Sequence, residues 1–357
     1  HLNLNKAAFA IARDTFALSG SILRLGEQAE VDLTLKGRLD LGNLSEAYPL
    51  EDAQGLQGLL RADLQAVFNL ASVREKRYQD IKSSGSLEVR DASWPLDGFV
   101  QPLEIERASM RFEPSRVNLD AFSGRLGQSD FQVRGTFRDY MGYLLGTGML
   151  RGAATLNSRQ LVLVDFQDRG DTEANPKDTM GFKLPANLDF TLQARAGTVL
   201  YEALVLNEVQ GILHLDGERL EFEEVQSRAL DGSIRLDGAL DTRGMHPDFN
   251  FNLGIAEARI GKALEAVSLF ESLVPMARAL QGSFNSKVRI QGALKEGFAP
   301  DLMSLSGDVV AEVLTAGLKS VNGDAVLGAL ASNLSFLNLQ DLQLKGLKTA
   351  LSFEKGK

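Results

Sequence analysis

Strict two-residue alternation of apolar and polar side chains is the feature of this sequence that most constrains its fold. In residues 31–36, Val31, Leu33 and Leu35 alternate with three polar residues. Successive side chains of a β-strand point to opposite faces, so this pattern predicts a strand with one apolar face and one wet face. Strands of this kind are typical of antiparallel sheets.

The same alternation recurs along the chain in about fourteen segments, which predicts a long antiparallel meander. Many of these segments end in an apolar residue, a polar residue and glycine, as in Leu236-Asp237-Gly238. A glycine inside a strand predicts a bulge or a bend. We expect one continuous apolar wall, lined by the bulky residues that share a phase: Leu33, Leu35, Phe131, Val133, Phe190, Leu192, Leu213, Leu215, Ile234, Leu236, Phe249 and Phe251.

Helical patterns are few, and the longest covers residues 258–281. Ile260, Leu264 and Val267 fall there at helical spacing, and Gly282 follows as a stop signal. The fold class is therefore mostly β: a long antiparallel meander, curled into an open groove if the wall is not covered by protein, with one or two short capping helices. Residues 324–330 predict a second short helix, 56–68 fit a helix or a strand, and 139–145 predict a short turn.

A polar, turn-rich segment at residues 167–181 interrupts the alternation and predicts an exposed loop. It divides the chain into a β segment at 1–166, a linker at 167–184 and a second β segment at 185–357, with the helix at about 258–281. The loop contains the tripeptide Arg169-Gly170-Asp171, which can bind cell-surface receptors. A match of three residues arises often by chance, so it carries no functional assignment.

Composition excludes several classes of function. The net charge of −9 disfavours nucleic acid, whose phosphates require a Lys/Arg surface. The chain has 0 cysteines, so it has no disulfide, no thiolate metal site and no cysteine nucleophile. No segment approaches the roughly 18 apolar residues that a membrane-spanning helix needs.

No motif for catalysis, metal or cofactor binding is present. His1, His214 and His246 stand apart, and a lone surface histidine lacks partners that would tune it. The glycines form neither a phosphate loop nor a nucleophile elbow. Glu221 and Glu223 alternate with an apolar residue, which favours a solvated strand face over a Ca²⁺ site. We therefore expect no enzyme, no catalytic residue, no metal and no cofactor.

The apolar wall has two interpretations. It can form the closed core of a sandwich or barrel, and periodicity alone favours this interpretation. It can instead line a trough for hydrocarbon, since burial stabilises each methylene by about 0.8 kcal/mol and a sixteen-carbon chain by roughly 10 kcal/mol.

A resemblance in the region from 185 to 353 shifts the balance toward the trough. A strand at Phe249–Leu253, the helix, the strand-glycine segments at 281–292 and the sequel at 301–309 together resemble the C-terminal region of the AsmA family. The resemblance implies an open apolar groove, related to TamB and chorein-type bridge proteins. It implies a periplasmic segment in a Gram-negative bacterium, attached to the inner membrane by an anchor upstream of residue 1. The family offers no catalytic residues.

We therefore expect a non-enzymatic lipid-binding or lipid-transfer segment that supports phospholipid transport and outer-membrane integrity. Its partners would be phospholipid acyl chains, and the helix would cap or plug one end of the groove. The alternative is a structural or adhesive cell-surface β-protein with a closed core and no lipid ligand. A glycan-active jelly roll is a third option, which would need a cleft with paired carboxylates.

Overall fold

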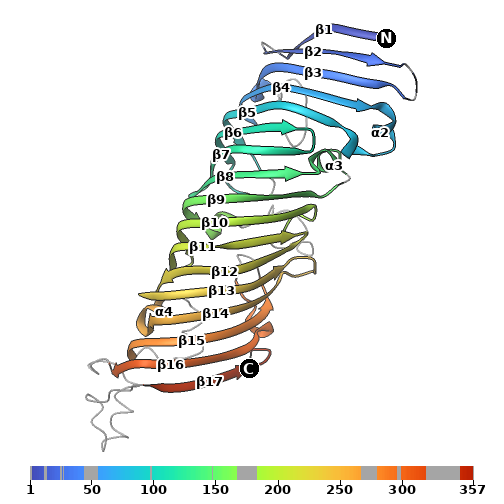
Figure 1. Cartoon of the computed structure of the whole chain (residues 1–357). Coiled ribbons are helices and arrows are strands. Elements are labelled where there is room, and N and C mark those ends of the chain that lie inside the picture. The colour runs from blue at the N-terminus through green and yellow to red at the C-terminus, as the bar shows by residue number, and fades with distance from the viewer. Residues whose placement is uncertain are drawn as a thin grey trace, which may run out of the picture.

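The computed structural model describes residues 2–11, 14–24, 26, 28–43, 55–96, 99–146, 148–166, 183–266, 280–295, 299–318 and 346–356. The described strands, seventeen in number, form one long, twisted sheet, here called the ladder. The two termini lie at its opposite ends (Figure 1). The fold is therefore the expected long β meander, curled into an open groove.

The strands are long for a globular protein, mostly ten to fourteen residues. Their bounds are β1 Leu2–Ile11, β2 Asp14–Leu23, β3 Glu30–Asp40, β4 Gln57–Asn69, β5 Lys82–Trp94, β6 Leu103–Glu113, β7 Arg116–Leu126, β8 Ser129–Arg138, β9 Leu150–Val162, β10 Leu188–Tyr201, β11 Leu204–Asp216, β12 Arg219–Ala229, β13 Gly232–Asp241, β14 Asp248–Arg259, β15 Leu280–Ala293, β16 Ser306–Leu318 and β17 Leu347–Phe353.

In the described ranges, short helices lie at the two long edges of the ladder. One edge, here called the α3 rim, carries α2 (Leu70–Arg74), α3 (Tyr140–Leu144) and the 3-10 turns η2 (Tyr78–Asp80) and η6 (Leu302–Ser304). The opposite edge, the α4 rim, carries η3 (Leu163–Phe166) and α4 (Ile260–Ala266). Figure 1 shows α2 and α3 at the right and α4 at the left.

Each strand pairs with its neighbours in sequence, and all of these pairs are antiparallel except β9 with β10. A parallel pair requires the chain to return to the rim from which the previous strand started. The junction between the two predicted segments is therefore a change of direction within one continuous sheet.

Two five-strand units, β5–β9 and β10–β14, are built alike. The pair β7–β8 shifts register between Leu119 and Phe122, and β12–β13 shifts at the equivalent place, between Phe222 and Val225. A short helix follows each unit at the α4 rim. A unit with five antiparallel strands starts at one rim and ends at the other. A second unit in the same orientation must therefore start at the rim where the first unit started. This accounts for the parallel pair.

Bulges bend the strands. Glu208, Glu224 and Glu257 lie inside strands with φ of 52°, 49° and 58°, and each sits at a register shift. A bulge leaves one residue unpaired, bends its strand and increases the local twist. Because bulges recur in neighbouring strands, the bends add up to a curl of the whole sheet.

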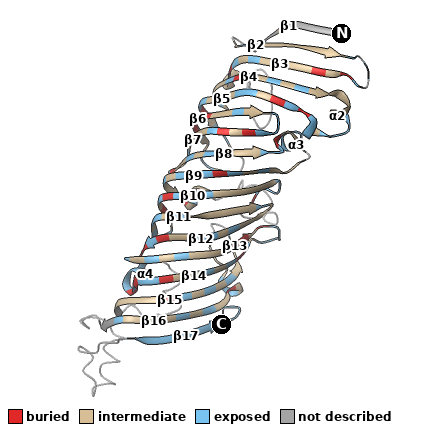
Figure 2. Cartoon of the chain, viewed as in Figure 1, coloured by how far each residue is buried: buried red, intermediate tan, exposed pale blue. Residues whose placement is uncertain are grey.

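The burial of the side chains is typical of a sheet with no second layer packed on it. Red, buried positions in Figure 2 are scattered among half-buried ones, and the largest side chain that is fully buried in the described residues is Ser129. A sheet with a second layer packed on it would bury large apolar side chains completely. The apolar side of this sheet is only half covered.

Several local predictions need correction. The helix predicted at 258–281 begins at Ile260 of α4, because Ala258 and Arg259 continue β14, opposite Phe284 and Ser283 of β15. It also lies at a lateral rim rather than at an end of the sheet (Figure 1). Residues 267–279, the helix predicted at 324–330 and the loop at 167–182 lie outside the described residues.

Three further local predictions have mixed outcomes. Residues 57–69 form the strand β4, and α3 replaces the predicted turn at 139–145. At the end of the predicted linker, Leu184 is not exposed: it is buried and donates its N–H to Thr242 Oγ1 at 3.0 Å.

Candidate functional site

One face of the sheet is an apolar wall that continues from strand to strand. Leu35 opposes Leu18 on one side and Leu64 on the other. Far along the sheet, Leu236 opposes Val225 and Leu253 in the same way. Directly opposed residues share a face. Followed through every pair from β2 to β17, the wall extends for about 70 Å at roughly 4.8 Å per strand.

All twelve residues predicted to line the wall lie on this face. Leu33, Leu35, Phe131, Val133, Phe190, Leu192, Leu213, Leu215, Ile234, Leu236, Phe249 and Phe251 are joined by the unbroken series of cross-strand pairs from β3 to β14. Phe249 is buried and the other eleven are half-buried. Whether they contact a ligand is a separate question from their common placement.

The wall also contains residues that were not singled out from the sequence. Most have the same phase as the predicted ones: Leu18, Leu64, Leu156, Phe222, Leu253 and Val288. Phe122 is different, because the bulge after Leu119 shifts the alternation by one residue. Reading the phase across each bulge would have found it.

The protein's own side chains cover parts of the wall near both rims. Near the α3 rim, Leu305, which follows η6, packs on Leu240 and Phe249. Near the α4 rim, Leu41 packs against a cluster that contains Ala92 and Ile105. These clusters narrow the groove at its edges.

The opposite face of the sheet is polar and salt-bridged. Lys36 Nζ lies 3.0 Å from Asp63 Oδ2, and Arg151 Nε lies 3.2 Å from Asp189 Oδ2. Such exposed pairs contribute little to stability individually. They make this face largely polar, in contrast to the wall.

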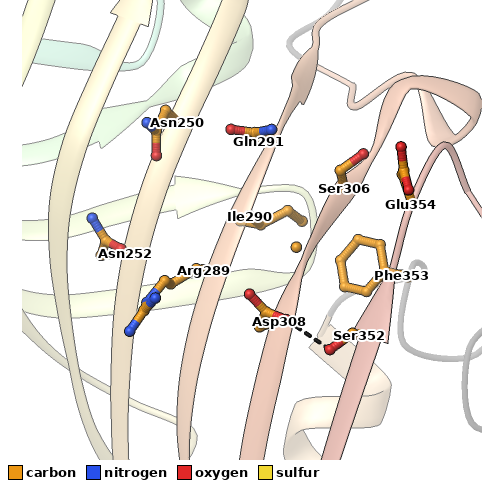
Figure 3. A pocket seen from close by; sticks show the side chains of 11 residues that line it. Asn250, Asn252, Arg289, Ile290, Gln291, Ser306, Asp308, Ser352, Phe353 and Glu354 are labelled. Carbon is orange, nitrogen blue, oxygen red and sulfur yellow. Dashed lines mark hydrogen bonds between the residues drawn. The ribbon is translucent and has the colours of Figure 1, made fainter.

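A hollow of about 750 Å³ lies on the polar face near the C-terminal end. Figure 3 shows its lining, in which Asn252, Arg289, Asp308 and Ser352 stand in register across β14–β17. Ser352 Oγ donates to Asp308 Oδ1 at 2.7 Å. The hollow offers hydrogen-bonding groups to water or a polar ligand.

His214 has partners that the sequence did not reveal. Thr191 Oγ1 lies 3.2 Å from Nδ1, and Glu223 Oε2 lies 2.9 Å from Nε2. The order hydroxyl, imidazole, carboxylate is that of a catalytic triad. A triad also needs backbone N–H groups aimed at an oxyanion, and here the backbones of β10 and β11 pair with each other around this row. The row therefore reads as a cross-strand hydrogen-bonded chain on an exposed face.

Metal and membrane signatures are lacking in the part of the chain that the structure describes. No group of three or more His, Cys, Asp or Glu residues there could hold a metal ion. None of the described helices has the length and apolar character required to span a bilayer.

No protein-family model, curated protein or solved structure matches the chain. Its function has to be argued from the wall and the open sheet.

Proposed function

We propose that the chain is a non-enzymatic lipid-binding or lipid-transfer segment whose apolar wall holds phospholipid acyl chains. The resemblance of residues 185–353 to the AsmA family supports the same function. It would place the segment in the periplasm, attached to the inner membrane by an anchor outside these residues, where it would serve phospholipid transport and outer-membrane integrity.

The observation that carries this proposal is a continuous apolar wall on an open, single-layered sheet. At the last strand the wall still presents Leu347 and Leu351, which are 50% and 48% exposed. Large exposed apolar surfaces are rare on proteins that bind nothing with them. Acyl chains laid along the wall would remove it from water, with a gain of about 0.8 kcal/mol per buried methylene.

The alternative, a structural or adhesive protein with a closed core, requires a second layer packed on the wall. All strands in the described ranges belong to one sheet, in which they follow one another in sequence. A single open sheet favours the lipid-binding function over this alternative.

Native mass spectrometry and solvent extraction of the protein purified from a Gram-negative host test the proposal. We expect phospholipid to remain bound through purification and to appear as discrete mass additions that disappear on delipidation. A delipidated sample should take up fluorescent phospholipid from vesicles. Protein that carries no lipid and takes up none would leave the closed-core alternative in place.

A further inference from the structure

The helix α3 lies at the edge of the wall and carries exposed apolar residues, here called the tip, at its C-terminal end. It lies at the α3 rim between β8 and β9, near the middle of the ladder (Figure 1). The first residue of this short helix packs on the sheet, and its C-terminal end faces water.

Tyr140 is the first residue of α3 and the one that packs on the sheet. It is 6% exposed, and its ring meets Phe112 of the wall edge-on with the ring centroids 5.7 Å apart. Its hydroxyl hydrogen-bonds to Ser83 Oγ and donates to the Glu113 carbonyl at 3.3 Å. Ser83 and Phe112 both lie on the wall, since their neighbours on β4 and β5 do. Tyr140 therefore anchors α3 to the wall by packing its ring on Phe112.

The C-terminal end of α3 and its C-cap present three consecutive large apolar residues to water. Tyr143, Leu144 and Leu145 are 39%, 66% and 48% exposed. Gly146 ends the helix at φ 75°, and Gly148 donates its N–H to the Gly142 carbonyl at 2.9 Å. A β-carbon on Gly148 would lie 2.9 Å from the Gly142 carbonyl carbon, so the two backbones are in close contact. The chain thus holds the tip out in a fixed turn.

The charges next to the tip are balanced, because Arg138, which opposes Arg151 across β8 and β9, adds a second positive charge beside Asp139 and Asp189. Arg151 Nη1 lies 3.1 Å from Asp139 Oδ2, and its Nε lies 3.2 Å from Asp189 Oδ2. Two guanidinium groups beside two carboxylates leave no net positive surface for anionic headgroups. A partner of α3 must be recognised by its apolar character.

We propose that α3 inserts the Tyr143–Leu145 tip into a phospholipid bilayer and forms the portal through which acyl chains pass over Tyr140 onto the wall. This inference rests on the proposed function and adds where lipid enters. Tyr140 connects the tip to the wall, since it belongs to the same helix and its ring contacts Phe112. Three side chains are far fewer than a stable protein interface uses, which buries about 800 Å² per partner. Shallow insertion of a few leucines and an aromatic residue suits the membrane interface.

Flotation with uncharged vesicles of phosphatidylcholine and phosphatidylethanolamine tests the membrane contact. We expect the protein to float with the vesicles, with little effect of salt, and the double variant Leu144→Asp/Leu145→Asp to bind at least about tenfold more weakly. Val164→Asp is the matched control, because Val164 is 46% exposed in a one-turn helix on the opposite rim. It should float like the unmodified protein. Circular dichroism and melting curves verify that all variants are folded.

Uptake of fluorescent phospholipid by delipidated protein tests the portal. The double variant should load more slowly from vesicles, yet hold as much lipid as the unmodified protein when lipid is supplied in detergent. A double variant that floats and loads normally overturns the portal and leaves the proposed function intact. The portal is also overturned, and the proposed function is left intact, if the unmodified protein carries lipid but does not bind vesicles. An unmodified protein that holds no lipid by either route overturns both.

Discussion

The rings of Phe137 and Phe190 meet with centroids 5.2 Å apart, although a whole strand separates their backbones. Phe137 lies on β8 and Phe190 on β10, and both oppose Gly152 on the β9 strand between them. Because Gly152 has no side chain, the two rings can lean toward each other and cover the space above this glycine. Aromatic neighbours that shield a strand glycine restore the packing that the glycine itself cannot provide.

The arrangement recurs in the second unit. Phe222 and Phe251 meet edge-on, 5.6 Å apart, and both oppose Gly238 of β13. The glycines that end the repeated apolar–polar–glycine segments therefore include positions on the wall itself. Their function is to make room for phenyl rings, and only some of them, such as Gly238 with φ 147°, also bend the backbone.

Replacing such a glycine should cost stability. A β-carbon on Gly152 would lie 2.5 Å from the Thr136 carbonyl oxygen and 3.0 Å from the Phe137 ring. We expect Gly152→Val to lower the free energy of unfolding by about 1–3 kcal/mol, the usual range for overpacking. Gly254→Val, on the polar face of β14 where the nearest atom is 3.9 Å away, should stay within about 0.5 kcal/mol. Urea denaturation of both variants measures the difference, and equal losses would contradict the packing explanation.

The alternation of apolar and polar residues predicted most strands and placed all twelve chosen side chains on one face. It fails where the wall is made of small residues. In β9 the wall positions include Gly152 and Ala154, so the strand lacks the bulky signal that marks β10, and the rings that cover it come from other strands. The periodicity of a strand depends on its own side chains, so it does not show which side chains of neighbouring strands pack over it.

Other features depend on contacts that no local pattern encodes. The parallel pair of β9 and β10 follows from stacking two odd-stranded units, which is a property of the whole sheet. The partners of His214 come from Thr191 and Glu223 on two other strands, so the sequence shows an isolated histidine. The helix at 258–281 was overextended because Ala258 belongs to a bulged strand end, which local spacing cannot distinguish from a helix start.

A single charge on the wall should reduce lipid capture without unfolding the sheet. Leu236 lies on the wall between Val225 and Leu253, whereas its neighbour Arg235 lies on the polar face. A carboxylate among acyl chains would be unpaired and desolvated, which is strongly unfavourable. We expect Leu236→Asp to retain roughly tenfold less phospholipid in native mass spectra, and Arg235→Asp to retain the normal amount. Equal retention by both variants would argue against the wall as the binding surface.

Acid should weaken the sheet through Asp241 at the α3 rim. Arg243 hydrogen-bonds to this carboxylate and, with Arg219 adding attraction, lowers the pKa of Asp241 to about 2. Because the pKa is depressed in the folded state, this stabilisation is present above about pH 4 and is lost as the pH falls toward 2. Asp241→Asn should cost about 1 kcal/mol near neutrality, a modest amount because solvent screens the pair. Melting curves at several pH values should show this difference shrinking below pH 4; a constant difference would exclude the ion pair as its cause.

The bulge at Glu224 depends on a single acceptor from the neighbouring strand. Asp237 Oδ1 accepts the Glu224 N–H at 2.8 Å, a donor that the bulge removes from the regular ladder. We expect Asp237→Ala to lower the free energy of unfolding by about 1–2 kcal/mol, and Asp237→Asn to lose much less, because an amide oxygen still accepts this hydrogen bond. Glu224 itself has φ 49°, where a β-branched side chain is strained, so Glu224→Val should also cost about 1–3 kcal/mol and Glu224→Gly should be tolerated. Urea denaturation ranks the four variants. If Asp237→Asn proved as damaging as Asp237→Ala, the carboxylate would act through its charge and not as the acceptor that holds the bend of the sheet.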